Sequence, residues 1–232
     1  MLLEANNLDV KYDEKQVIYG ASIKVGAGEF VALIGHNGAG KTTLLKTICG
    51  YLKPAAGTVI YKGENITGKS PAVNVRKRIS FVHQEKSLFP NLSVLENLEL
   101  AGYAIGESMD LKERLKAVYR LFPVLEEKEK QFADTLSGGQ QKQLAVAMSM
   151  LVRPNLLLLD EPTLGLSPNI VSDMGKVLKE IQAMGTAILL VEQNVKMAIS
   201  LAHRIYVMRT GKIILEDSRE NMEKRTSLWD LF

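Results

Sequence analysis

The fold of this chain is decided by the stretch Gly35-His36-Asn37-Gly38-Ala39-Gly40-Lys41-Thr42. It matches G-x-x-x-x-G-K-[ST] at every specified position, which is the pattern of a phosphate-binding loop. Glycines let successive backbone N–H groups surround an anionic di- or triphosphate. Lys41 would reach the β- and γ-phosphates, and the Thr42 hydroxyl would ligate Mg²⁺. The stretch therefore predicts a binding site for a di- or triphosphate.

The segments on both sides of this loop support the same interpretation. The apolar run Phe30–Ile34 is typical of a buried strand, and Leu44, Leu45 and Ile48 follow the spacing of a helix. A strand, a glycine-rich loop and a helix in this order place the phosphates at a helix N-terminus, where backbone dipoles favour anions. A chance match in a glycine-rich turn would explain the loop but not its neighbours.

Length and composition limit the number of domains and the class of protein that the chain can form. The 232 residues suffice for one large domain, or for one core with a smaller inserted lobe. A hydrophobic content of 46% and a charged content of 24% are ordinary for a soluble globular protein. The net charge of +3 is small, so it does not indicate a nucleic-acid partner.

Membrane spans and disulfides are not expected. No apolar stretch reaches 18 residues, and the N-terminus lacks the basic and apolar regions of a signal peptide. Cys49 is the single cysteine, which excludes an internal disulfide and fits a reducing cytoplasm. We expect it to be a small core residue, and we expect no regulatory domain after the glycine at position 211.

Short apolar segments predict two kinds of sheet. The alternating run 21–25 and the glycine-bounded run 57–63 indicate an antiparallel sheet beside the phosphate loop. Three continuous apolar runs are typical of central strands in a parallel sheet that is covered on both faces. These runs are 79–82, 156–159 and 187–191. A closing hairpin is expected at 205–215, with its turn at Thr210-Gly211.

Helical patterns dominate between the strands, from about residue 85 to 154. Asp110 and Glu113 have the spacing of a capping box, and apolar residues follow at helical spacing until Pro123, which should end the helix. We therefore expect one α/β domain over residues 1–232. Its core would comprise 1–84 and 155–232, with a helical subdomain inserted at about 85–154.

A second motif is Leu136-Ser137-Gly138-Gly139-Gln140. Ser137 and Gln140 have capping-box spacing, so a helix should begin here with exposed N–H groups and a positive dipole. The two glycines leave room for an anion to approach closely. Taken alone, the motif also fits an ordinary capped helix.

A third motif is the apolar run that ends in Asp160 and Glu161. Two carboxylates at the end of a buried strand are costly unless they serve a cation or a proton transfer. Asp160 fits the acid that holds Mg²⁺ in phosphate-loop enzymes. Glu161 fits a general base that acts on a water attacking the γ-phosphate.

With these motifs in this order, the chain resembles an ATP-binding-cassette (ABC) ATPase over nearly its full length. Gln84 after a strand and Pro162-Thr163 after the acidic pair also match that family. The resemblance implies a P-loop NTPase (RecA-like) α/β core with an antiparallel β subdomain and an inserted helical subdomain. It also implies a head-to-tail homo- or heterodimer with two ATP molecules between the subunits, docked on membrane permeases at the cytoplasmic face, with a substrate-binding protein acting indirectly.

The resemblance assigns roles residue by residue. The expected ATP contacts within one subunit are Tyr12, stacked on adenine, and Asn37, Gly38, Ala39, Gly40, Lys41, Thr42 and Thr43. The expected contacts from the opposite subunit are Ser137, Gly138, Gly139 and Gln140. The expected Mg²⁺ ligands are Thr42, Gln84 and Asp160, and the expected catalytic residues are Glu161, Gln193 and Gln84.

Two positions depart from the family pattern. Gln193 stands where the family usually has a His that contacts the γ-phosphate, and Gln can donate a hydrogen bond but cannot become cationic. The loop Gly165-Leu166-Ser167-Pro168 lacks the usual acidic residue, so communication between the two ATP sites is expected to differ. The histidines at 36, 83 and 203 do not replace the missing one.

With these departures, the chain resembles the shorter ATP-binding subunit of branched-chain amino-acid importers. The segments Ile66-Thr67-Gly68 and 88–94 point the same way. ATPases that serve urea or lipopolysaccharide transport look alike and remain alternatives. Further alternatives are a non-transport ABC ATPase acting on nucleic acid or ribosomes, and a protein that binds ATP without turnover. The small net charge and the short helical lobe disfavour the former, and intact Lys41 and Glu161 disfavour the latter.

Overall fold

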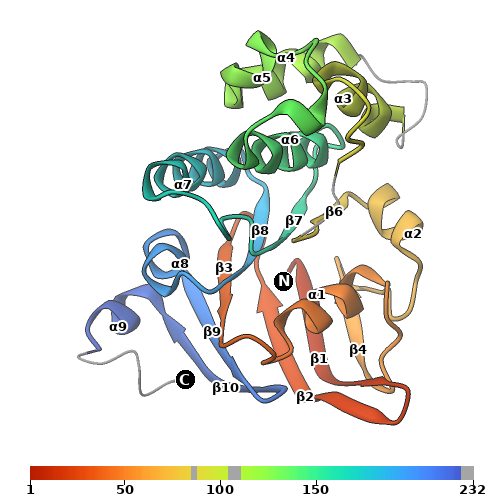
Figure 1. Ribbon diagram of the computed structural model, residues 1–232. Helices are drawn as coiled ribbons and strands as arrows, with labels where there is room; N and C mark the ends of the chain where they lie inside the picture. Colours follow the sequence, from red (N-terminus) through yellow and green to blue (C-terminus); the bar gives the residue numbers. More distant parts are fainter. Residues whose placement is uncertain (85–87, 104–110, 226–232) are drawn as a thin grey trace.

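The computed structural model describes residues 1–84, 88–103 and 111–225. Figure 1 shows two sheets in its lower half and a group of helices above them. A six-stranded sheet carries the strands on either side of the phosphate loop, and a four-stranded sheet lies beside it. The α/β class that was expected from the sequence is confirmed.

The six-stranded sheet has the order β10-β9-β3-β8-β7-β6. Five strands run parallel, and only β10 is antiparallel to its neighbour β9. The bounds are β3 Phe30–Ile34, β6 Ile79–Val82, β7 Leu156–Asp160, β8 Ala187–Glu192, β9 Arg204–Arg209 and β10 Lys212–Ser218. Every residue of β3, β7 and β8 is buried, as the continuous apolar runs predicted.

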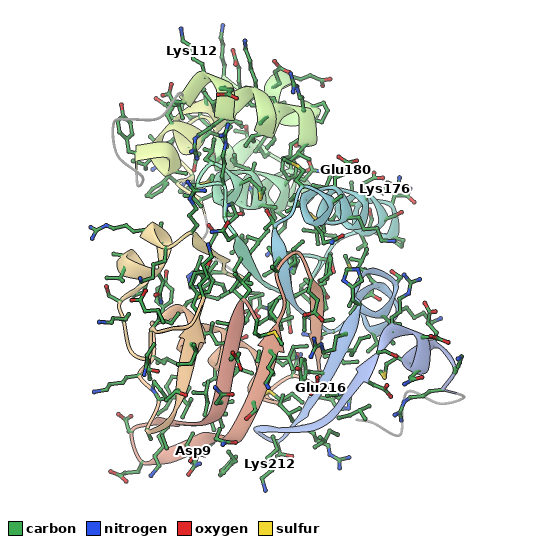
Figure 2. All side chains as sticks on the ribbon, turned by 180° about the vertical axis from the view of Figure 1, so that it is seen from behind. Asp9, Lys112, Lys176, Glu180, Lys212 and Glu216 are labelled. Carbon is green, nitrogen blue, oxygen red and sulfur yellow. The ribbon has the colours of Figure 1, made fainter. Side chains whose placement is uncertain are left out.

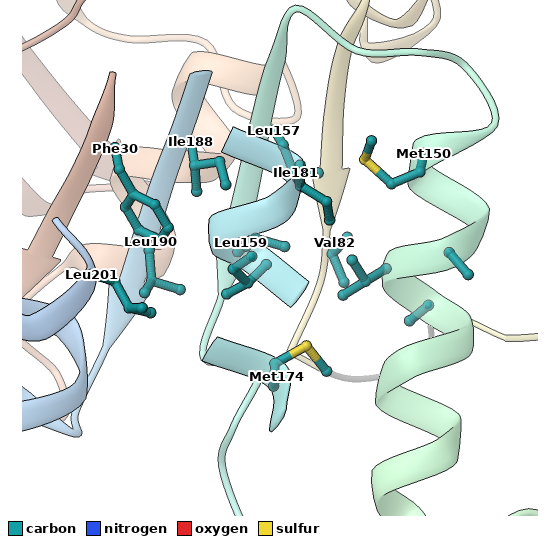
Figure 3. Packing of buried hydrophobic residues seen from close by; sticks show 14 of the residues in the cluster. Phe30, Val82, Met150, Leu157, Leu159, Met174, Ile181, Ile188, Leu190 and Leu201 are labelled. Carbon is teal, nitrogen blue, oxygen red and sulfur yellow. The ribbon is translucent and has the colours of Figure 1, made fainter. Parts of the chain in front are cut away.

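Alternate residues of these buried strands pack into two different hydrophobic cores. Phe30, Leu157 and Leu190 belong to a cluster that also holds the apolar faces of α6, α7 and α8, part of which is drawn in Figure 3. Leu33 and Leu158 belong to a second cluster with α1 and the four-stranded sheet. Because successive side chains of a strand point to opposite faces, a continuous apolar run is what a sheet covered on both faces requires.

The four-stranded sheet is antiparallel throughout, with the order β2-β1-β4-β5. Its strands are β1 Leu3–Tyr12, β2 Lys15–Val25, β4 Ala56–Tyr61 and β5 Glu64–Asn65. The antiparallel sheet and the β9–β10 hairpin predicted from the sequence are both confirmed. The helix α1, Lys41–Cys49, follows the phosphate loop and packs against this sheet.

The turn of the β9–β10 hairpin braces the phosphate loop. Gly211 donates its N–H to the carbonyl of Ala39 at 2.8 Å and accepts from the Tyr19 N–H at 2.9 Å. Its φ of +78° and its surroundings both demand glycine, since a Cβ there would lie 2.1 Å from the Val17 carbonyl oxygen. The loop is therefore held by residues remote from it in sequence.

The remaining helices complete the fold. Those in the upper part of Figure 1 are α3 Val94–Tyr103, α4 Leu111–Leu121, α5 Pro123–Glu127 and α6 Gly138–Met150. The others are α2 Pro71–Arg76, α7 Pro168–Ala183, α8 Val195–Leu201 and α9 Arg219–Glu223. A short 3₁₀ turn, Ala133–Thr135, precedes α6. The proposed division into a core and a helical subdomain at about 85–154 stays a prediction.

The helix that was expected to end at Pro123 does end just before it. The expected cap residue Asp110 lies outside the described residues, and α4 ends at Leu121, before Pro123. Pro123 itself begins α5, because its restricted φ and missing N–H suit the first turn of a helix.

The outer surface of α7 is polar. On α7, Met174 and Leu178 are buried, whereas Lys176 and Glu180 are labelled on the outer side in Figure 2. Within the described ranges, no helix combines the length and apolar character that crossing a membrane requires.

Candidate active site

The phosphate loop joins β3 to α1 with glycines in left-handed conformations. Gly38 has φ +78° and Gly40 has φ +106°. A Cβ at Gly40 would lie 2.7 Å from the Cδ1 atom of Ile18, so a larger residue does not fit. Gly40 is the N-cap of α1 and offers no side chain to the N–H groups of the first turn. Those donors are left for an external anion.

Lys41 is buried at the base of this loop. Only 4% of it is exposed, and its Nζ donates to the carbonyls of Gly35 at 2.7 Å and His36 at 3.1 Å. The same ammonium lies 3.3 Å from Oε1 of Glu161. A phosphate that enters the loop would compete with this carboxylate for the ammonium.

The side chains expected to hold Mg²⁺ meet at the end of β7. The Thr42 hydroxyl donates to Oδ1 of Asp160 at 3.1 Å, and Asp160 is 1% exposed. Burial raises the pKa of the Asp160 carboxyl, and the hydrogen bond from Thr42 opposes that rise. Adjacent hydroxyl and carboxylate oxygens are ligands that Mg²⁺ accepts together with phosphate oxygens, so this pair fits the ion.

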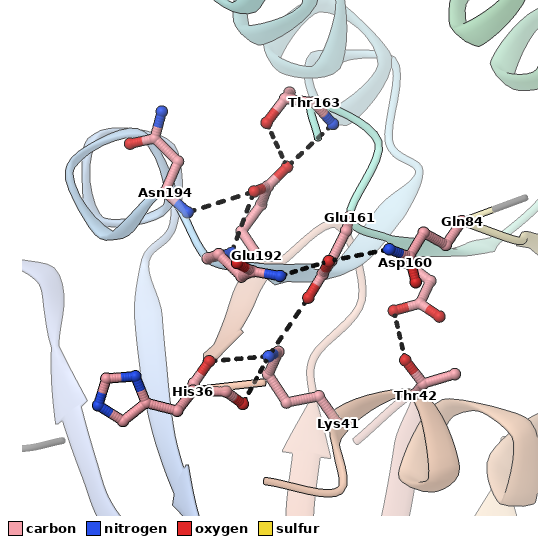
Figure 4. A network of polar contacts seen from close by, with 11 residues as sticks. His36, Lys41, Thr42, Gln84, Asp160, Glu161, Thr163, Glu192 and Asn194 are labelled. Carbon is pink, nitrogen blue, oxygen red and sulfur yellow. Dashed lines mark hydrogen bonds and ion pairs between the residues drawn. The ribbon is translucent and has the colours of Figure 1, made fainter. Parts of the chain in front are cut away.

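The Glu161 carboxylate is contacted by side chains from three separate segments of the chain, as Figure 4 shows. Besides Lys41, its carboxylate accepts from the Gln193 amide at 2.7 Å and from the Gln84 amide at 3.3 Å. Its φ is +48°, which is strained for a residue with a side chain and is typical of functional sites. The structure thus brings together the three residues that the resemblance named as catalytic, and Gln193 contacts the expected base directly.

These residues surround a cavity of about 350 Å³, a size that suits a small ligand. Its described lining includes Asn37, Gly38, Ala39, Gly40, Lys41, Thr42, Thr43, Gln84, Glu161 and Gln193, all named from the sequence, and also Val17 and Leu164. Sequence reasoning missed the last two because neither belongs to a motif. Tyr12 is 42% exposed at the end of β1, with its hydroxyl 3.4 Å from that of Thr43.

The second motif lies elsewhere in the chain. Ser137 is the N-cap of α6, and the predicted capping box is confirmed by reciprocal hydrogen bonds with Gln140. The Ser137 N–H donates to the Gln140 side chain at 3.0 Å, and the Gln140 N–H donates to the Ser137 hydroxyl at 3.4 Å. Gly138 lines a different cavity, of about 680 Å³, together with Gln84 and Leu164. None of the four motif residues is among the described residues lining the phosphate-loop cavity.

Comparison with known proteins decides which family combines these features. A family model described as ABC transporter matches residues 18–164, which is more than half of the chain. The chain belongs to the ABC transporter family. It is accordingly an ATPase of ABC type.

Curated relatives of this ABC ATPase align over nearly its whole length. It is 38% identical over 217 residues to the high-affinity branched-chain amino acid transport ATP-binding protein BraG of Pseudomonas aeruginosa, covering 94% of this chain and 93% of that protein. It is 34% identical to the probable branched-chain amino acid transport ATP-binding protein LivF of Archaeoglobus fulgidus, covering 91% and 90%. It is 30% identical to the lipopolysaccharide export system ATP-binding protein LptB of Haemophilus influenzae, covering 95% and 92%.

Solved structures agree with the fold of this ABC ATPase. A nucleotide-free ATP-binding cassette from an ABC transporter superposes with a TM-score of 0.88 at 26% identity, covering 99% of this chain and 98% of that one. An ATP-binding cassette of an ABC transporter in its ADP conformation superposes with a TM-score of 0.87 at 28% identity, covering 99% and 96%.

Proposed function

We propose that this ABC ATPase energises the import of branched-chain amino acids as one of two ATP-binding subunits docked on membrane permeases. The observation that carries the hydrolytic part is the convergence of Lys41, Gln84 and Gln193 on Glu161 beside the phosphate loop. The substrate is supported by the relatives from P. aeruginosa and A. fulgidus, both named for branched-chain amino-acid transport.

In the proposed reaction, the N–H groups of the phosphate loop and the Lys41 ammonium bind the β- and γ-phosphates. Thr42 and Asp160, with Gln84, would hold Mg²⁺, which neutralises charge on the phosphate oxygens when bound. Glu161 accepts the proton of the attacking water, since it is the carboxylate nearest to the phosphate loop that is not used for the ion. Gln193 orients that carboxylate through its amide and has no proton to exchange at neutral pH.

The motif at Ser137–Gln140 acts in the opposite subunit of this proposal. It starts α6 with N–H groups and two glycines, yet it does not line the phosphate-loop cavity of its own chain. A head-to-tail dimer would bring it to the γ-phosphate of the other subunit. Binding at the cytoplasmic face of the membrane, through the permeases, follows from the same proposal.

Uptake measurements test this function. The chain would be co-expressed with the permease subunits and the substrate-binding protein of a branched-chain amino-acid importer from the same organism and reconstituted in vesicles. We expect ATP-dependent uptake of radiolabelled leucine, isoleucine and valine, and no uptake with the Glu161→Gln variant. ATP-dependent transport of lipopolysaccharide, urea or putrescine without leucine uptake would refute the proposed substrate and leave the ATPase assignment intact.

A further inference from the structure

One buried carboxylate next to the site has no role in the reaction as described so far. Glu192 is the last residue of β8 and is 2% exposed. Burial raises the pKa of this carboxyl and would destabilise the charged form without compensating donors. The sequence places Glu192 directly before Gln193 but assigns it no role of its own.

The donors around Glu192 come from two different segments. Its Oε1 accepts from the Thr163 hydroxyl at 2.6 Å and from the Thr163 N–H at 3.2 Å. Its Oε2 accepts from the N–H of Gln193 at 3.2 Å and from the N–H of Asn194 at 3.4 Å. One carboxylate therefore joins the segment after β7 to the segment after β8, as Figure 4 shows.

Both segments carry residues of the proposed hydrolytic machinery. Thr163 lies two residues after Glu161, and Gln193 directly follows Glu192. The contact between the Gln193 amide and the Glu161 carboxylate, at 2.7 Å, spans the same two segments. Its geometry depends on how these segments are held relative to each other.

The strands themselves do not need Glu192 to stay together. β7 and β8 pair in register from Leu156 to Asp160, and the Glu161 N–H donates to the Val191 carbonyl at 2.9 Å. This ladder ends just where the two catalytic side chains begin. Glu192 extends the connection beyond the ladder, through side-chain and backbone hydrogen bonds instead of strand pairing.

We propose that Glu192 is a positioning residue that holds the Gln193 amide against the Glu161 carboxylate by clamping Gln193 to Thr163. This inference rests on the proposed roles of Glu161 and Gln193 in hydrolysis. Glu192 is not among the described residues that line the phosphate-loop cavity, and its effect passes through the two residues it places.

The first test is Glu192→Gln, which keeps the size of the side chain but turns one acceptor into an N–H donor that faces other N–H groups. We expect kcat for ATP hydrolysis to fall roughly 10-fold or more, because misplacing a catalytic group by about 1 Å can cost 10²-fold. ATP affinity should be unchanged, since Lys41 and the phosphate loop are untouched. Thr163→Val should show the same pattern, and Thr163→Ser should restore kcat.

A matched control separates positioning from general stability. Thr186 is also a buried threonine, and its hydroxyl donates to the Pro154 carbonyl at 3.0 Å, at the opposite end of β8. Thr186→Val should lower Tm as Thr163→Val does but leave kcat unchanged. Equal kcat in the Thr163→Val and Thr186→Val variants would overturn the proposal, and this comparison holds even if Glu192→Gln fails to fold.

A double-mutant cycle tests whether Glu192 acts through Gln193. In a Gln193→Ala background, Glu192→Gln should lower kcat much less than in the wild type, because the amide it positions is gone. An undiminished effect would overturn the proposal. If Glu161→Gln kept wild-type turnover in the same assay, the proposed role of Glu161 would be at fault instead.

Discussion

Two helices of this ABC ATPase, α1 and α6, have glycines at their N-termini, but the N–H groups of the first turn find different hydrogen-bond acceptors in the two helices. At α1, the N-cap Gly40 brings no side chain to the first-turn N–H groups, and a buried ammonium lies beside them. At α6, Ser137 and Gln140 cap each other, and no residue of this helix start lines the phosphate-loop cavity. The first terminus depends on a ligand for its donors, whereas the second is stable without one.

This difference indicates a division of labour. In the proposed mechanism, the α1 terminus binds phosphate within one chain, through N–H groups that no side chain caps. The α6 terminus is already capped by Ser137 and Gln140, and in the same mechanism the N–H groups of its glycines bind the anion held by the other subunit. We therefore expect ATP binding to a single chain, and the proton transfer at Glu161, to depend on residues at the α1 side, whereas the association of two chains should depend on the α6 side.

The largest effect is expected for Glu161→Gln, which tests whether chemistry belongs to the α1 side. Removing a general base lowers the rate by about 10²–10⁴. ATP affinity should rise, because Lys41 loses the carboxylate that lies 3.3 Å from it and competes with phosphate. Phosphate release and nucleotide titration measure the two effects. Wild-type turnover in this variant, with an inactive Gln193→Ala variant, would show that the roles assigned to Glu161 and Gln193 are wrong.

The next effect concerns binding at α1. Lys41→Ala removes a charged donor to the phosphates, and such hydrogen bonds contribute about 1.5–3 kcal/mol. The Kd of a fluorescent ATP analogue should increase roughly 10- to 100-fold. If wild type and variant bound the analogue equally well, the phosphate loop would not be the nucleotide site.

The α6 side is tested by Ser137→Arg, with Ser137→Ala as its control. Both variants lose the capping hydroxyl, which costs about 0.5–2 kcal/mol of stability, but only the arginine fills the approach to the glycines. We expect both monomers to bind ATP normally and only the arginine variant to lose ATP-dependent dimerisation, measured by light scattering. ATP-dependent dimers of the arginine variant would break the proposed division of labour.

The smallest effect is expected for Tyr12→Ala. Stacking of a base on an aromatic side chain contributes about 1–3 kcal/mol, and the half-exposed position of Tyr12 favours the lower end of this range. ATP should bind about fivefold more weakly, while kcat at saturating ATP stays at the wild-type value. A lower kcat at saturation would mean that Tyr12 acts through Thr43, whose hydroxyl it approaches at 3.4 Å.

The sequence predicted those features that local chemistry dictates. The loop Gly35–Thr42, the buried strand ending at Asp160 and the capping box at Ser137 each depend on neighbours a few residues away, and all three have the predicted local structure. The parallel and antiparallel strands were also separable, because continuous and alternating apolar runs suit different surroundings.

Features that depend on long-range packing could not be read in this way. Nothing in the local sequence indicates that β3 lies between β8 and β9, or that Lys41 and Glu161 form an ion pair. The clamp at Glu192 joins segments that are separate in sequence, so only the fold reveals it. Pro123 ends one helix as predicted, but the short helix α5 that it begins was not predicted, because the helical spacing of the preceding residues says nothing about it.

The hydrogen bonds between Gly211 and the phosphate-loop region have a consequence for how this protein folds during its synthesis on the ribosome. The phosphate loop is synthesised early, but the N–H that supports the Ala39 carbonyl comes from a turn near the C-terminal end. The strand leading into the loop, β3, also pairs only with β8 and β9, which leave the ribosome late. A nascent chain therefore carries the phosphate-loop sequence before the segments that support the loop are synthesised, and we expect the first half of the chain to gain little stability from ATP.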